Sequence, residues 1–236
     1  MDRNVWETHA RTPMWVKSLF WRRPLTQLPA PLSFVNAPSF GEDLPGDQRS
    51  DAVLAFLSRR RSTSLKLMSD DGPDAQTLDQ ILALAMRAPD HRRVFPWRFI
   101  VFEGDQRRAF GETLAQLYAG DYPEATPEDL DKQRGRLLRS HTVVALIASI
   151  DPEHKTPVWE QELSVGAVAM NLLIAATAAG FGANWLTEWP SDHAGVAQAL
   201  ELGEHEAIRG FFYLGGPAET IKERARPDAA AKISRW

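Results

Sequence analysis

Apolar and polar positions follow a regular pattern only from Ser50 onward, where helix-like and strand-like spacings alternate along the chain. Helical spacing predicts helices within residues 50–58, 73–87, 105–119, 126–140, 157–180 and 191–203. Apolar and β-branched runs predict strands at 97–104, 142–150 and 208–216, with a short strand or loop at 181–190. Helices are in excess, so the pattern favours an α+β or α/β layered domain with a central sheet.

Several predicted helices begin with a side chain that can cap free backbone N–H groups. Ser50, Asp74 and Thr126 stand at such starts, and Pro127 occupies the first helical position after Thr126. Within the predicted helices at 50–58, 73–87 and 105–119, apolar side chains recur at helical spacing and so share one face of each helix. They are Val53, Leu54, Leu57, Leu78, Ile81, Leu82, Ala85, Phe110, Leu114 and Leu117.

The first 48 residues differ from the rest, because they are rich in proline and carry little periodicity after Phe20. We interpret residues 1–48 as a partly disordered extension and residues 49–236 as the folded domain. Within the extension, Met14 to Pro24 is aromatic and basic. Three interpretations stay open for it: an interfacial membrane helix, an arm that packs on a partner subunit, or part of an overlong gene model.

Composition excludes several classes of protein. Of 236 residues, 44% are hydrophobic and 25% charged, which is ordinary for a soluble globular protein. The net charge of −4 argues against a mainly nucleic-acid-binding role. The chain has no cysteine, which excludes disulfides, thiolate catalysis and Cys-ligated metal sites. We expect a cytoplasmic protein, without a signal peptide and with membrane association unlikely to be its main role.

The candidate chemistry is cationic and aromatic. "SRRRS" at 58–62 offers guanidinium donors suited to phosphate, although arginine is also favoured at a helix end. "RAPDHRRVFPW" at 87–97 adds His91 among arginines; His91 could donate a proton or a hydrogen bond to a ligand, but taken alone it is better explained as a solvated surface histidine. "GFGANW" at 180–185 follows a helix, so it does not fit a phosphate-binding glycine loop. No nucleophile motif or metal-ligand spacing is present. This profile is typical of a protein that holds an anionic aromatic cofactor, which then performs the chemistry.

Several segments together resemble the FMN-dependent nitroreductase family, in particular its minimal branch of small bacterial proteins assigned as NAD(P)H nitroreductases. They are "RRS" at 60–62, "MRAPDH" at 86–91, "PWRFIVFEG" at 96–104, "VWEQELSVGAVAMNLLIAATAAGFGANW" at 158–185 and "GFFYLGGP" at 210–217. The resemblance implies a three-layer α+β fold with a central, mostly antiparallel sheet flanked by helices. It also implies an intertwined homodimer with one FMN in each of two interface clefts.

The resemblance also implies roles for individual residues. Arg60, Arg61 and Ser62 would hold the flavin phosphate and ribityl chain, with Arg224 or Arg226 of the tail completing the phosphate site. The remaining implied cofactor contacts are Arg87 and His91, together with Trp185, Leu186 and Thr187 from the other subunit. The implied NAD(P)H contacts are Ala175, Ala176, Thr177, Ala178, Ala179 and Gly180.

The implied reaction has two halves: NAD(P)H reduces FMN and leaves, and a nitroaromatic, quinone or similar conjugated acceptor then takes the electrons. Arg87 is the candidate for the cation that stabilises charge developing on the flavin. The chain departs from the family pattern at Phe95, where Gln is usual, at Ser64, where many relatives have Lys, and at Leu186, where a close relative would have Arg. These departures keep open a flavin-binding homologue without NAD(P)H turnover. The aromatic N-terminal segment keeps open a membrane- or partner-binding protein.

Overall fold

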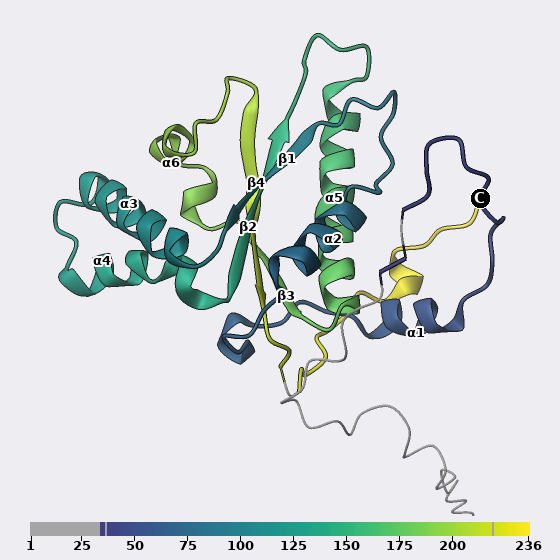
Figure 1. Cartoon of the computed structure of the whole chain (residues 1–236), viewed down its shortest axis with the longest axis horizontal. Helices are drawn as coiled ribbons and strands as arrows, with labels where there is room; N and C mark the ends of the chain where they lie inside the picture. Colours follow the sequence, from purple (N-terminus) through teal and green to yellow (C-terminus); the bar gives the residue numbers. More distant parts are fainter. Residues whose placement is uncertain (1–33, 36, 219) are drawn as a thin grey trace, which may run out of the picture.

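The computed structural model describes residues 34–35, 37–218 and 220–236, and its central element is a four-stranded antiparallel sheet (Figure 1). The strands are β1 (Trp97–Phe102), β2 (Thr142–Ser149), β3 (Gly182–Leu186) and β4 (Glu206–Gly215), in the spatial order β1-β2-β4-β3. The predicted α+β class and antiparallel sheet are therefore confirmed, and the short segment at 181–190 does contain a strand.

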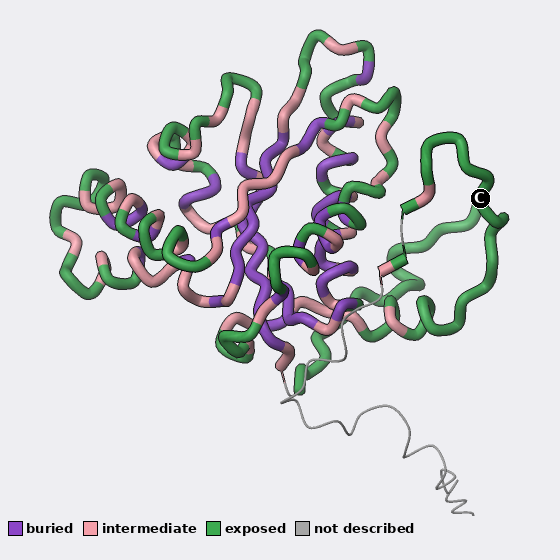
Figure 2. The backbone as a smooth tube through the Cα atoms, in the orientation of Figure 1, coloured by how far each residue is buried: buried purple, intermediate pink, exposed green. Residues whose placement is uncertain are grey.

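Helices cover both faces of this sheet. They are α1 (Asp51–Arg59), α2 (Ala75–Ala85), α3 (Asp105–Asp121), α4 (Pro127–Arg134), α5 (Val158–Ala178) and α6 (Ala194–Ala199), with short 3-10 turns η2 (Leu65–Leu67), η3 (Arg136–Arg139), η4 (Trp189–Ser191) and η5 (Ala229–Ala231). Helices α2 and α5 pack on one face, and α3 and α6 pack on the other, with α4 against α3 (Figure 1). Helix α1 contributes no buried residue to the packing on either face. Buried residues concentrate in the sheet and along α5 (Figure 2).

Strand β2 joins the two cores because both of its faces are covered. Val144, Leu146 and Ala148 point into the core formed with α2 and α5. Their neighbours along the strand, which include Val143 and Ile147, point into the core formed with α3 and α6. This explains why the segment is almost wholly apolar rather than alternating.

The predicted caps are confirmed at three helices. Ser50 accepts a hydrogen bond from Val53 N, Asp74 accepts one from Thr77 N, and Thr126 forms a reciprocal capping box with Asp129. The start of the last helix was predicted wrongly. Residues 189–191 form a 3-10 turn, and α6 begins only at Ala194, because the ring of His193 caps Val196 N.

The N-terminal part of the described chain packs little against the core. Helix α1 forms as predicted, but Val53, Leu54 and Leu57 are exposed, so its apolar face has no cover within the described part of the chain. Residues 37–49 form no helix or strand, and the aromatic segment from Met14 to Pro24 lies outside the described residues. By length and composition α5 could cross a membrane, but half of its most apolar stretch is buried inside the fold.

A cluster around Glu206 links the start of β4 to β1 and β2. The carboxylate accepts hydrogen bonds from Arg98 Nε at 2.6 Å and Nη2 at 2.7 Å, and from Ser149 Oγ at 2.7 Å. The Arg98 guanidinium is the largest influence, and it lowers the pKa of Glu206 to about 2, with further help from Gly203 N and Ser149. The folded protein therefore binds this proton more weakly than the unfolded chain does.

We predict that Glu206→Gln destabilises the fold at neutral pH by on the order of 1 kcal/mol, because the pair is partly exposed. Since the carboxylate's pKa falls on folding, its stabilisation is present above its unfolded value near 4.5 and is lost as the pH falls toward about 2. Urea unfolding should show that the difference in unfolding free energy between wild type and variant is smaller at pH 3 than at pH 7. A difference independent of pH would contradict this assignment. Glu128→Gln, in an exposed pair with Lys132, is the control and should change stability little.

Candidate functional site

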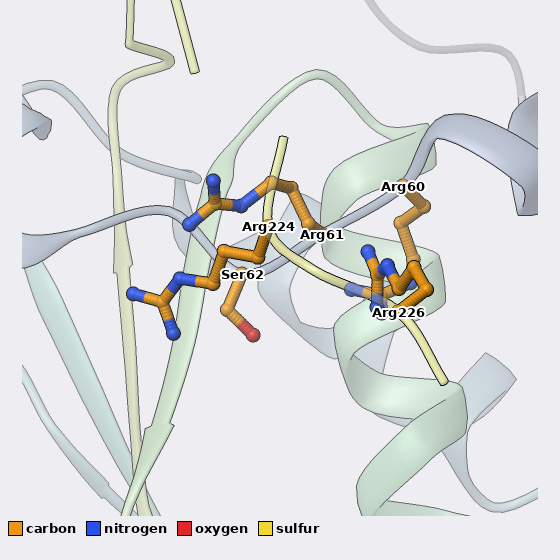
Figure 3. Close-up of a pocket in the computed structure, with 5 residues that line it drawn as sticks. All are labelled: Arg60, Arg61, Ser62, Arg224 and Arg226. Carbon is orange, nitrogen blue, oxygen red and sulfur yellow. The ribbon is translucent and has the colours of Figure 1, made fainter. Parts of the chain in front are cut away.

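Four arginines converge on one pocket at the end of α1. The pocket is lined by Arg60, Arg61 and Ser62 from the segment after the helix, and by Arg224 and Arg226 from the C-terminal tail (Figure 3). Figure 3 shows the Arg60 and Arg226 guanidinium groups next to each other on one side, with Arg61 and Arg224 on the other. The structure thus brings together the arginine–serine motif and both tail arginines that the sequence offered as alternatives.

The charge in this pocket is incompletely compensated. Arg60 Nη1 is buried and has no hydrogen-bond partner among the described residues. Burial lowers the pKa of Arg60, and the neighbouring positive charge of Arg226 lowers it further. Glu223 lies 3.1 Å from Arg226, so one carboxylate approaches the rim. An unpartnered guanidinium nitrogen among like charges favours an anion with several acceptor oxygens, such as phosphate.

Backbone pairing fixes the arginine segment beside β3. Thr63 N donates to Ala183 O at 2.9 Å, and Asn184 Nδ2 donates to Thr63 O at 2.7 Å. The segment from Arg60 to Ser62 and the strand that carries Trp185 and Leu186 therefore lie side by side within one chain. In this chain the residues bonded to Thr63 are Ala183 and Asn184, and Trp185 follows them on the same strand but does not line the pocket. The contact of the Trp185 segment with a cofactor of the other subunit stays a prediction.

The aromatic segment itself is well anchored. The Trp185 ring stacks on Phe212 with 5.3 Å between centroids, and 37% of the residue remains exposed. Leu186 packs against the core on the α3 side, and Thr187 is exposed. The next residue, Glu188, is held by Arg136 and Arg139; burial opposes ionisation, but these two arginines lower the pKa of Glu188 overall.

The loop with His91 is held in an unusual backbone conformation. Arg92, Arg93 and Phe95 have φ values of 69°, 54° and 53°, which non-glycine residues rarely adopt. The Asp90 carboxylate stabilises the turn by accepting hydrogen bonds from Val94 N and Phe95 N. Phe95 is consequently turned outward and is 61% exposed, with its ring at 86° to that of Trp97.

The same loop is attached to the start of α5. His91 Nδ1 lies 2.6 Å from Glu160 Oε2, and the His91 carbonyl accepts a hydrogen bond from Thr156 Oγ1. Arg87 is exposed, and its carbonyl accepts from Asn171 Nδ2. The arginine pocket, in contrast, adjoins β3, which follows the other end of α5. Within one chain, Arg87 and His91 therefore do not line the arginine pocket.

The predicted NAD(P)H segment lies at the end of α5. Ala175, Ala176 and Ala179 are buried in the core, and Thr177 Oγ1 donates to Leu173 O. Ala178 is exposed, and Gly180 turns the chain with φ +91°. The contact stays a prediction, and in this chain it would involve Ala178 and the Gly180 turn rather than the buried alanines. Among the described residues, no group of His, Cys, Asp or Glu is arranged to hold a metal ion.

Comparison with known proteins identifies the family. The model of the nitroreductase family matches residues 57–216. This chain belongs to the nitroreductase family. It is 36% identical over 169 residues to the Escherichia coli (strain K12) protein named "Putative NAD(P)H nitroreductase YdjA", covering 71% of this chain and 88% of that protein. A Haemophilus influenzae protein named "Putative NAD(P)H nitroreductase" is 31% identical over 176 residues, which cover 74% of this chain and 93% of that protein.

Solved structures confirm the fold. The nitroreductase-like family protein from Bacillus cereus superposes with a TM-score of 0.67 at 18% identity, covering 80% of this chain and 98% of that chain. A nitroreductase with bound FMN from Bacteroides fragilis gives a TM-score of 0.58 at 17% identity, covering 79% of this chain and 100% of that chain. The nitroreductase-like fold predicted from the sequence is therefore confirmed.

The arginine pocket should bind inorganic phosphate, whatever reaction the protein catalyses. Inorganic phosphate, compared with chloride at matched ionic strength, should raise the melting temperature of protein freed of bound cofactor. Arg60→Gln should weaken this phosphate binding about tenfold, because a charge-assisted hydrogen bond is worth about 1.5–3 kcal/mol. Arg59→Gln is the control, since Arg59 is adjacent but does not line the pocket. Equal effects of phosphate on both variants would count against an anion site here.

Proposed function

We propose that this protein is an FMN-dependent oxidoreductase of nitroreductase type, which takes hydride from NAD(P)H and reduces a nitroaromatic, quinone or similar conjugated acceptor. The observation that carries the proposal is the arginine pocket, in which a buried Arg60 nitrogen has no hydrogen-bond partner within the part of the chain that the structure describes. Its position in a nitroreductase-family chain favours the phosphate of a flavin mononucleotide over a free anion. A cytoplasmic location of the protein is part of the same proposal.

The residues present fit FMN at both ends of the molecule. The guanidinium groups of Arg60, Arg61, Arg224 and Arg226 suit the terminal phosphate, and the Ser62 hydroxyl beside them suits a polar chain. The exposed ring of Trp185, on the adjoining strand, suits a flat conjugated system. When bound, FMN supplies the hydride chemistry, and the side chains supply binding, orientation and charge.

Arg87 and His91 are the groups we assign to the reacting end. The Arg87 guanidinium would stabilise negative charge on the reduced ring system. The contact with Glu160 orients the His91 ring, leaving Nε2 as the nitrogen available to a ligand. These residues lie away from the arginine pocket of their own chain, so their proposed role requires a second copy.

We therefore propose a homodimer in which the His91 loop of one copy approaches the arginine pocket of the other. An apolar stripe on α5 supports this assembly. Trp159, Leu163, Gly166 and Met170 are exposed at helical spacing along one side of the helix, which otherwise forms the core. A Cβ added at Gly166 would meet nothing within 4 Å in this chain, which leaves space for close approach by another helix. An exposed stripe of this kind is typical of an interface.

The direct test is the visible spectrum of the purified protein, followed by NAD(P)H oxidation with a quinone or a nitroaromatic compound. We expect flavin absorption, FMN released on denaturation at about one per chain, and acceptor-dependent turnover. Riboflavin should bind at least tenfold more weakly than FMN, because it lacks the phosphate that the arginines would contact. Bound FMN without turnover would favour the alternative of a flavin-binding homologue. Failure to bind FMN would refute the proposal.

The dimer has its own test. Leu163 is 65% exposed, and Leu163→Asp places a charge in the centre of the α5 stripe. Sedimentation should show a dimer for the wild type and a shift toward monomer for the variant, with FMN affinity reduced at least tenfold in parallel. Tyr122→Asp, a comparable exposed position at the end of α3 on the other side of the sheet, should leave both unchanged. A wild-type protein that sediments as a monomer and still binds FMN tightly would contradict the shared site.

A further inference from the structure

Strand β4 is irregular where it passes Trp185. Gly210 pairs with Leu146, but the next pair is Ile147 with Ile208, so Arg209 has no partner across the ladder. This extra residue is a β-bulge, which bends a strand and redirects the groups beside it. Gly210 adopts φ +134°, a conformation that side-chain-bearing residues rarely reach.

The space above Gly210 is occupied by the indole of Trp185. A Cβ built at Gly210 would lie 2.1 Å from Trp185 Nε1 and 2.5 Å from its Cδ1, closer than real Cβ atoms approach other heavy atoms. The indole N–H donates to Arg209 O at 2.8 Å. The Trp185 ring is therefore held by two features of the bulge: Gly210 has no side chain to occupy its space, and the Arg209 carbonyl accepts its N–H.

The bulge is braced from α5. Arg209 Nε lies 3.0 Å from Glu162 Oε2, and Nη2 lies 2.5 Å from Oε1, so the pairing is bidentate. Glu162 thereby fixes the residue whose carbonyl receives the indole N–H. Sequence patterns did not suggest this connection, although a glycine inside a strand is a known signal of a bulge.

This arrangement limits what Trp185 can offer a ligand. Its N–H is already bonded to the chain, and Phe212 covers one side of the ring. The exposed part can provide apolar and stacking contact but no hydrogen bond from the indole nitrogen. That surface suits a flat conjugated ring.

We propose that the Arg209–Gly210 bulge, braced by Glu162, is a positioning device that holds the Trp185 ring in the plane required to contact a flat conjugated ring in the site. The inference rests on the proposed function for the identity of that ring, which is either the flavin or the acceptor. Gly210 and Glu162 act through Trp185 and are positioning residues.

The first arm of the test requires no ligand. The sequence has eight tryptophans, and Trp185→Phe identifies the Trp185 indole N–H signal in a ¹⁵N NMR spectrum. In the wild type this proton should exchange slowly, and in Gly210→Ala it should shift and exchange at least tenfold faster. Gly104→Ala is the matched control, because Gly104 also has a positive φ (+51°) but nothing within 4 Å of its added Cβ. An unchanged Trp185 signal in Gly210→Ala would overturn the inference.

The second arm measures ligand contact. Gly210→Ala should weaken FMN binding at least fivefold if the ring is the flavin, or raise the acceptor KM at least fivefold if the ring is the acceptor. In a protein that already carries Trp185→Ala, adding Gly210→Ala should change neither FMN affinity nor acceptor KM further. Additive effects of the two substitutions would instead show that Gly210 has a merely structural role. Glu162→Gln keeps Gly210 but weakens the contact with Arg209, so it should change the same FMN affinity or acceptor KM in the same direction by a smaller factor. This variant decides the question if Gly210→Ala does not fold. If the wild type binds no flavin, the proposed function fails, while the indole signal still decides whether the bulge positions Trp185.

Discussion

The pairing of β2 with β4 is the constraint on which the rest of the structure depends. Both strands are buried on both faces, and their side chains alternate between the core under α2 and α5 and the core under α3 and α6. A shift of register by one residue would exchange these two sets of side chains. The ladder also carries the bulge at Arg209, so the same element that organises the fold sets the position of the Trp185 ring.

A second constraint is electrostatic. Four guanidinium groups meet where the segment after α1 passes the C-terminal tail, and their mutual repulsion opposes the arrangement unless an anion is present. The tail contributes no buried residue among those described from 220 to 236. A phosphate held between Arg60 and Arg226 would therefore offset the cost of ordering this tail. If the proposed FMN binds here, it would complete the fold locally as well as provide the chemistry.

Sequence reasoning succeeded where the signal was local. Capping residues and apolar spacing located α2, α4 and β1, and the arginine–serine motif marked one wall of the pocket. It failed at α6, since a histidine ring is not a usual helix cap. It also missed Glu160, Glu162 and Gly210, because their roles depend on contacts with residues far away along the chain. The apolar face of α1 was predicted correctly as a pattern, but its burial was not, because periodicity does not specify the surface that covers it.

Helix α5 links the proposed assembly to the proposed chemistry. Its 21 residues span about 30 Å, with the His91 loop attached to the first turns and the arginine pocket adjoining the strand after the last. One chain thus holds the two halves of the candidate site apart, and the helix that separates them also exposes the apolar stripe. Pairing of two such helices would cover the stripe and could bring complementary halves together. Cofactor binding and dimer formation would then stabilise each other. A ligand that contacts both copies binds the dimer more tightly than the monomer and so shifts the equilibrium toward the dimer.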